Sequence, residues 1–179
     1  MAVEVGVLGP LRIVIAATRF DVGSRLRRLL VLRLAVEPRA VVTVDALAEA
    51  WWGEALPHDP VNAVRFHVWK LRSALPGGCG LVATASGGYR LGDDVRTDVE
   101  RFEQTIAESR CSSGVDPARA VAGLDSALSL IRGGVYEDAG EAEFAQSEIR
   151  RLTEMVVSVQ ETRLDLLIGL GRYGEAIPE

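Results

Sequence analysis

Residues 59–75 carry the pattern that most restricts how this chain can fold. Asp59 can accept a hydrogen bond from a free backbone N–H at the start of a helix, and Pro60 suits the first helical position, where no N–H is needed. Four aliphatic residues then recur at steps of four, three and four residues: Val64, Val68, Leu71 and Leu75. This spacing predicts a helix with one apolar stripe that faces a core.

The opposite arc of this predicted helix combines cations, polar groups and two aromatic rings. Its members are Asn62, Arg65, Phe66, Trp69, Lys70, Arg72 and Ser73. Cations suit phosphates and guanine edges, and apolar groups can contact a thymine methyl. The arc therefore predicts a DNA-recognition helix. The alternative from the residues alone is a basic surface helix whose aromatic rings pack on a neighbouring domain.

The composition is ordinary for a soluble globular protein of one or two domains, since 48% of the 179 residues are hydrophobic and 25% are charged. No segment approaches the ~18 apolar residues of a membrane span, and Glu4 interrupts the apolar start, unlike a signal peptide. Cys79 and Cys111 form no metal-binding spacing and fit a reducing compartment. We therefore expect a cytoplasmic protein that has no membrane contact, metal or cofactor.

The charge is divided unevenly along the chain. Residues 1–98 hold 12 Arg and Lys against 10 Asp and Glu, which gives +2, whereas residues 99–179 hold 8 against 15, which gives −7. This asymmetry suggests nucleic acid as the partner of the first half and a different partner for the second half. Binding of DNA would then depend on where the cations lie rather than on bulk charge.

The order of predicted elements indicates a specific arrangement. The elements are strands over residues 3–22, a helix from Ser24 to Pro38, a short strand at 41–42, a helix over 45–52, the helix that starts at Pro60, and a hairpin over 81–91. Two helices joined by a turn and followed by a hairpin form the winged helix-turn-helix arrangement, in which one helix enters the major groove.

Four motifs resemble known regulators. Residues 63–75, AVRFHVWKLRSAL, look like the recognition helix of OmpR-type winged-helix regulators, and residues 87–91, GGYRL, resemble their wing. Residues 5–11, VGVLGPL, and 50–53, AWWG, are similar to two motifs of one subgroup, the SARP-type (antibiotic-regulatory) activators. The four motifs stand in the order that this family requires.

The second half resembles the bacterial transcriptional activator domain of the same family. The matching segments are 98–102 (DVERF), 127–133 (ALSLIRG) and 144–145 (FA), with Ile131 in place of the usual Trp, and residues 169–177 resemble a tetratricopeptide junction. The implied fold class is an α+β N-terminal winged helix-turn-helix domain (1–97) followed by an all-α helical-repeat, TPR-like domain (98–179). Because helical repeats need neighbours to bury their apolar faces, we expect this second domain to be incomplete.

The resemblance implies a sequence-specific transcriptional activator. Such a protein would bind direct repeats in double-stranded promoter DNA as a homodimer and contact the RNA polymerase holoenzyme. At the matching positions, Lys70 would read bases or phosphates, Phe66 would meet a thymine methyl, His67 and Arg72 would hold phosphates, and Arg90 would reach the minor groove or its phosphates.

The chain departs from the family pattern at Arg65, where an acidic residue is common, and at Trp69, where Ser or Arg is usual. These departures leave a second hypothesis open, a helical-repeat module that binds a protein or senses a ligand and has weak or no affinity for DNA. An enzyme is the least favoured class, because the chain has no phosphate-binding GxxxxGK[ST] loop and no HExxH motif. Neither His58 nor His67 has a convincing nucleophile beside it.

Overall fold

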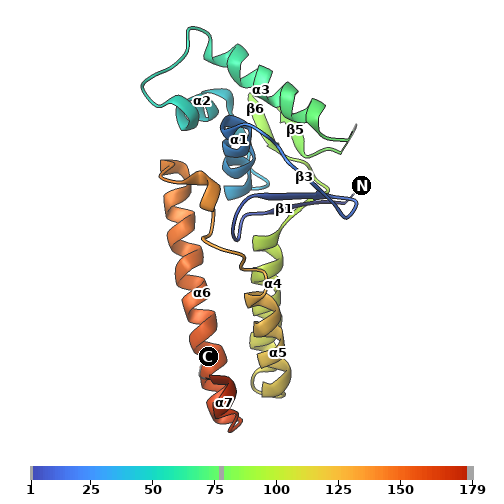
Figure 1. Cartoon of the computed structure of the whole chain (residues 1–179), viewed down its shortest axis with the longest axis vertical. Helices are drawn as coiled ribbons and strands as arrows, with labels where there is room; N and C mark the ends of the chain where they lie inside the picture. Colours follow the sequence, from blue (N-terminus) through green and yellow to red (C-terminus); the bar gives the residue numbers. More distant parts are fainter. Residues whose placement is uncertain (1, 77–78, 177–179) are drawn as a thin grey trace.

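The computed structural model describes residues 2–76 and 79–176. The molecule is elongated, with helix α3 at one end and helices α6 and α7 reaching the other (Figure 1). The N-terminal strands lie between these ends, where the strand-rich half meets the helical half. Ile177 and Glu179, which belong to the expected second domain, lie outside the described residues.

The first sheet joins the start of the chain to a later strand. Its strands, in the spatial order β3-β2-β1-β7, are Thr18–Phe20, Arg12–Ile15, Val3–Gly6 and Val95–Thr97. The first three are antiparallel neighbours, and β7 pairs in parallel with β1, so that Val3 lies opposite Val95. The sequence analysis missed β7, because three residues carry too little alternation to be recognised as a strand.

The next elements confirm the predicted order of helices and hairpin. They are α1 (Arg25–Val36), β4 (Val42–Thr43), α2 (Val44–Trp52), α3 (Pro60–Ala74), β5 (Val82–Ala85) and β6 (Gly88–Leu91). The second sheet has the order β4-β6-β5, with both pairs antiparallel. Helix α1 lies beneath α2 and α3 and buries Leu30, Leu32 and Leu34 completely.

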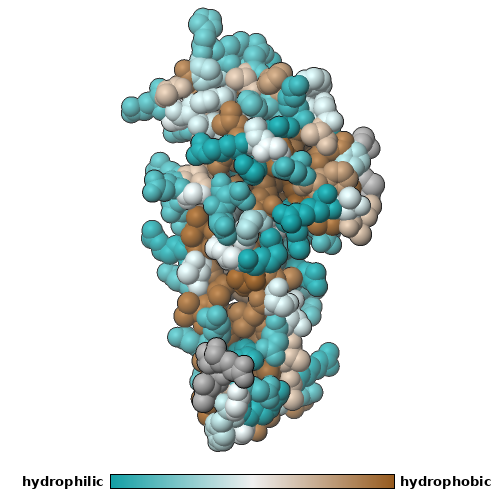
Figure 2. Space-filling view, in the orientation of Figure 1, coloured by the Kyte–Doolittle hydropathy of each residue, from teal (hydrophilic) through white to brown (hydrophobic). Residues whose placement is uncertain are grey.

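The remaining elements are helical. They are α4 (Asp98–Ser112), α5 (Pro117–Leu128), the 3-10 turn η1 (Glu137–Ala139), α6 (Glu143–Gly169) and the short α7 (Tyr173–Ala176). Thr97 and Glu100 form a capping box that starts α4, and Asp116 with Pro117 starts α5. Helix α6 runs beside α4 and α5 (Figure 1), and Figure 2 shows hydrophobic residues gathered along this seam.

A short loop connects the two halves directly. The backbone N–H groups of Arg132 and Tyr136 donate to the carbonyl oxygens of Leu8 and Val7, each at 2.7 Å. The backbone N–H of Leu11 donates to the carboxylate of Asp138 at 2.6 Å. The segment after α5 is thus hydrogen-bonded to the loop between β1 and β2, although more than 100 residues separate the two in the sequence.

The fold class expected from the sequence, a winged helix-turn-helix domain followed by a separate all-α helical-repeat domain, is wrong. One cluster of buried residues includes Val5 of the first sheet, Leu34 of α1 and Leu152 of α6, so that the two halves share a core. Helix α4 begins at the residue after β7, and α6 packs against α1 as well as α5. The helices α4–α6 therefore complete the fold of the strand-rich half and do not form a domain of their own.

Candidate nucleic-acid interface

Helix α3 starts as its sequence predicts. The carboxylate of Asp59 accepts a hydrogen bond from the backbone N–H of Asn62 at 3.0 Å, and Pro60 occupies the first turn. The stripe of Val64, Val68, Leu71 and Leu75 is buried, with exposed fractions between 0% and 6%. Burial of these four residues against the core determines which face of α3 is turned outward.

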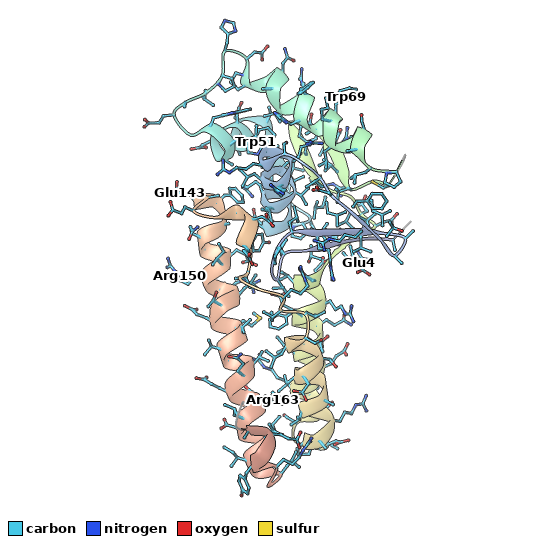
Figure 3. The ribbon with its side chains drawn as sticks, viewed as in Figure 1. Glu4, Trp51, Trp69, Glu143, Arg150 and Arg163 are labelled. Carbon is cyan, nitrogen blue, oxygen red and sulfur yellow. The ribbon has the colours of Figure 1, made fainter. Side chains whose placement is uncertain are left out.

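The outward face brings together six of the nine residues that the sequence analysis assigned to DNA. These six are Asn62, Arg65, Phe66, Trp69, Lys70 and Ser73, and all are exposed; Arg72 is exposed as well but is hydrogen-bonded to the hairpin. Figure 3 shows Trp69 on the outer side of α3, at the end of the molecule. Within the described residues, neither Arg65 nor Lys70 forms an ion pair, so that both charges are available to a ligand.

Two aromatic rings and one ammonium group gather at the centre of this face. The ring centroids of Phe66 and Trp69 are 6.1 Å apart. The Nζ atom of Lys70 lies 5.5 Å from the Phe66 centroid and 5.2 Å from the Trp69 centroid. Both distances are within the range of a cation–π interaction, which limits the directions that the lysine side chain can take.

His67 lies on the flank of α3, half-buried between two rings. Its centroid is 5.4 Å from that of Trp51 and 5.6 Å from that of Phe66, both in edge-on geometry. Burial lowers the pKa of His67, and the positive charge of Arg27 lowers it further. The imidazole is therefore neutral near pH 7 and can offer a phosphate an N–H group but no positive charge.

Arg72 lies against the hairpin rather than outward. Its Nη2 atom donates to the carbonyl oxygen of Val82 and to Oγ1 of Thr84, each at 2.9 Å, and its guanidinium lies 5.8 Å from the ring centroid of Tyr89. These contacts attach the strands β5 and β6 to the last turn of α3. This role of Arg72 is not predictable from the sequence, because its partners lie at least 10 residues away and leave no periodic signal.

Arg90 on β6 is also engaged within the protein. Its Nη1 and Nη2 atoms donate to the two carboxylate oxygens of Asp93 at 2.7 and 3.0 Å. This two-point hydrogen bond raises the pKa of Arg90 and lowers the pKa of Asp93, and their mutual attraction adds to both shifts. A contact of Arg90 with DNA stays a prediction, and it would require the arginine to exchange Asp93 for a phosphate.

Strand β6 of the hairpin approaches β4 so closely that position 88 requires glycine. Gly88 pairs with Thr43 on β4, and a Cβ atom there would overlap the carbonyl oxygen of Val42. The next glycine, Gly87, has a φ of +81°, which suits the turn between β5 and β6. Gly88 thus allows the hairpin to lie close against β4, and Gly87 allows its turn.

The side chains that could bind a metal ion lie apart from one another in the described part of the chain. The described segments 2–76 and 79–176 hold no group of three or more His, Cys, Asp or Glu side chains that could bind a metal ion. Cys79 and Cys111 are free thiols, one buried and one exposed. No helix in these segments has the length and apolar character that crossing a membrane requires.

Residues 97–179 match the family model described as the bacterial transcriptional activator domain. The chain is 30% identical to the transcriptional regulatory protein MoaR1 of Mycobacterium tuberculosis over 99% of this chain and 60% of that protein. It is 30% identical to the regulatory protein AfsR of Streptomyces coelicolor over 99% of this chain and 18% of that protein. The chain therefore spans less than two thirds of either relative.

A solved structure of Mycobacterium tuberculosis EmbR, in complex with a low affinity phosphopeptide, resembles this chain with a TM-score of 0.86 at 28% identity. The match covers 97% of this chain, so that both halves superpose together, which agrees with a shared core rather than two separate domains; it covers 47% of the EmbR chain. MoaR1 is named as a transcriptional regulatory protein and AfsR as a regulatory protein. Across these comparisons, the shared features are relatives named as regulators and a match of residues 97–179 to the bacterial transcriptional activator domain.

Proposed function

We propose that this chain is a sequence-specific DNA-binding regulator that reads double-stranded DNA with the outward face of α3. The observation that carries the proposal is the set of six exposed side chains on one face of a helix that stands at the end of the molecule. The face offers two unpaired cations, an amide, a hydroxyl and two aromatic rings, and this is the chemistry that major-groove edges and phosphates accept. A helix of 15 residues is also of a size that the major groove admits.

In this proposal the hairpin and the flank of α3 have supporting roles. Arg72 holds β5 and β6 beside α3, which would bring the hairpin close to the backbone next to the bound groove. Neutral His67 would contact a phosphate by donating an N–H group, and Arg90 would do so after exchanging Asp93 for a phosphate. Removal of Arg72 should weaken binding through loss of hairpin position as well as through loss of charge.

We further propose a functional division between residues 1–97, which contact DNA, and residues 98–179, which contact a protein. The second segment carries the excess of acidic residues and matches the bacterial transcriptional activator domain. By resemblance to the SARP-type activators, we propose that activation uses direct repeats, a homodimer on DNA and contact with the RNA polymerase holoenzyme. Because the chain spans only part of those relatives, these partners are part of the proposal.

The test is binding of the chain to sheared genomic duplex DNA at ~50 mM and ~200 mM salt. The variant Arg65→Ala/Lys70→Ala removes two cations from α3, and we expect it to lose most of the affinity and to reduce the salt slope by about 2. The matched control is Arg119→Ala/Arg150→Ala, which removes two exposed cations from α5 and α6 and should bind like the unaltered chain. Figure 3 labels Arg150 on the side of α6, away from α3.

A second readout locates the contact without depending on affinity. Lys70 is the only lysine of the chain, so acylation of side-chain amines reports on this position alone. Bound DNA should protect Lys70 from acylation. A folded chain that binds no duplex at either salt concentration, or binds with Lys70 fully reactive, would contradict the proposal and favour a protein-interaction module.

A further inference from the structure

Phe66 and Trp69, here called the aromatic pair, occupy the middle of the outward face of α3. They belong to the line 62, 66, 69 and 73, whose steps of four, three and four residues follow one side of a helix directly opposite the buried stripe. Phe66 is 51% exposed and Trp69 is 57% exposed. The pair is therefore the most prominent apolar feature of the surface that we assign to DNA.

The aromatic pair is attached to the core through other rings. Trp51, which is 7% exposed, lies edge-on to His67, and His67 lies edge-on to Phe66, which in turn faces Trp69. Successive ring centroids along this series are 5.4, 5.6 and 6.1 Å apart. The edge-on contacts favour one orientation of the His67 and Phe66 rings, while Trp69 is tilted by 39° to Phe66, so that Phe66 needs little ordering when it binds.

Lys70 adds a charge at the border of the same surface. Its ammonium lies over both rings of the pair, at 5.5 and 5.2 Å from their centroids. The apolar centre is thus bounded by a cation that can face a phosphate or the O6 and N7 atoms of guanine. A cation at this border fits a DNA ligand better than the apolar surface of a protein, which would leave the ammonium without a polar partner.

The chemistry of the major groove offers one apolar group for such a pair. Adenine, guanine and cytosine present donors and acceptors there, and an aromatic ring placed over them leaves those groups without hydrogen bonds. Thymine presents a C5 methyl group, which gains from leaving water. We propose that the aromatic pair selects DNA sites by contact with thymine methyl groups, and that Trp69, the more exposed of the two rings, is the specificity-determining member.

This inference rests on the proposed function, and the experiment is chosen so that the two can fail separately. A duplex enriched from genomic DNA is synthesised with each thymine replaced in turn by uracil, which removes the C5 methyl and keeps every hydrogen-bonding group. We expect one or two positions at which uracil weakens binding about fourfold, the effect of one buried methyl group. The converse test adds a methyl group: cytosines next to the sensitive thymines are replaced by 5-methylcytosine.

The variant Trp69→Ala connects that sensitivity to the residue. It should bind the thymine duplex several-fold more weakly and should no longer distinguish thymine from uracil at the sensitive position. Tyr173→Ala is the matched control, because Tyr173 is an aromatic residue that is 62% exposed at the far end of the molecule. It should keep both the affinity and the fourfold difference.

Three results would overturn the inference. If uracil at every position changes the affinity by less than twofold, the protein contacts no thymine methyl group, and the proposed DNA binding is not contradicted. Equal uracil sensitivity in Trp69→Ala and in the unaltered chain assigns the methyl contact to another residue. Absence of any DNA binding by the folded chain contradicts the proposed function and removes this inference with it.

Discussion

The carboxylate of Asp98 lies 3.1 Å from the Nη2 atom of Arg132, and it also accepts the backbone N–H groups of Val7 and Leu8 at 2.8 and 3.1 Å. Asp98 is the first residue of α4, and Arg132 follows α5. One buried carboxylate thus connects the end of β1 with two parts of the helical half. These contacts of Asp98 help to explain why the two halves do not form separate domains.

Asp98→Ala should lower the free energy of unfolding by about 3 kcal/mol, because it leaves a half-buried guanidinium and two backbone N–H groups without their partner. The measurement is unfolding in urea. Asp94→Ala is the control, since Asp94 is exposed and should change stability by less than ~0.5 kcal/mol. Equal stability of the two variants would contradict the structural role of this ion pair.

The shared core predicts that the chain unfolds in one cooperative transition. Because Val5, Leu34 and Leu152 belong to a single buried cluster, loss of packing in one half exposes apolar residues of the other half. Circular dichroism, which follows the helices, and tryptophan fluorescence should report the same midpoint, because Trp51, Trp52 and Trp69 all lie in the strand-rich half. Two separated midpoints would indicate independent halves after all.

His67 should make stability depend on pH. Burial, followed by the charge of Arg27, holds the pKa of His67 below its ordinary value of 6.5. The unfolded chain then binds the proton of His67 more tightly than the folded chain does. The contribution of His67 to the free energy of unfolding is therefore complete above pH 6.5, and it is lost as the pH falls from 6.5 towards the lowered pKa. Comparison of unfolding at about pH 7.5 and about pH 5.5 tests this, because the ordinary pKa lies between the two.

The chain has only one other histidine, His58, which is exposed and provides the control. His67→Gln should remove the part of the loss of stability at low pH that His67 causes. His58→Gln should leave the pH dependence as it is. An unchanged slope in His67→Gln would mean that other groups produce it.

Tyr136→Phe should leave stability unchanged or raise it by up to about 1 kcal/mol. The Tyr136 side chain is 1% exposed, and its hydroxyl finds no hydrogen-bond partner among the described residues. The same burial, with the charges of Glu148 and Asp98, raises the pKa of the phenol. Thermal unfolding provides the measurement, and a loss of more than about 1 kcal/mol would show that the hydroxyl is hydrogen-bonded after all.

Gly88→Ala should destabilise the hairpin and weaken DNA binding together. The added methyl would meet the carbonyl group of Val42 on β4, and backbone atoms there have no free space to move. We expect a loss of about 3 kcal/mol from this overpacking. Gly114→Ala is the control, because a Cβ atom at that glycine meets nothing within 4 Å. A stable Gly88→Ala variant with full affinity would contradict the described position of the hairpin.

The candidate site was predicted only in part from the sequence. The cap at Asp59 and the period of Val64 and Val68 identified α3 and its outward face, since both signals lie within one helix. The surroundings of Arg72 and Arg90 were not predictable, because their partners are set by how the hairpin packs. Their assignment to phosphates followed from position alone and stays untested.

The sequence by itself determined the local elements: Asp59 with Pro60 and Asp116 with Pro117 start helices, and the glycines at 87 and 88 turn a hairpin. These features depend on neighbours in the chain and are visible as short patterns. Only the tertiary structure decided that β7 pairs with β1, that Asp98 holds Arg132, and that one core spans both halves. Such contacts join residues far apart in the sequence, and hydrophobic periodicity shows that a face is buried without showing which face it meets.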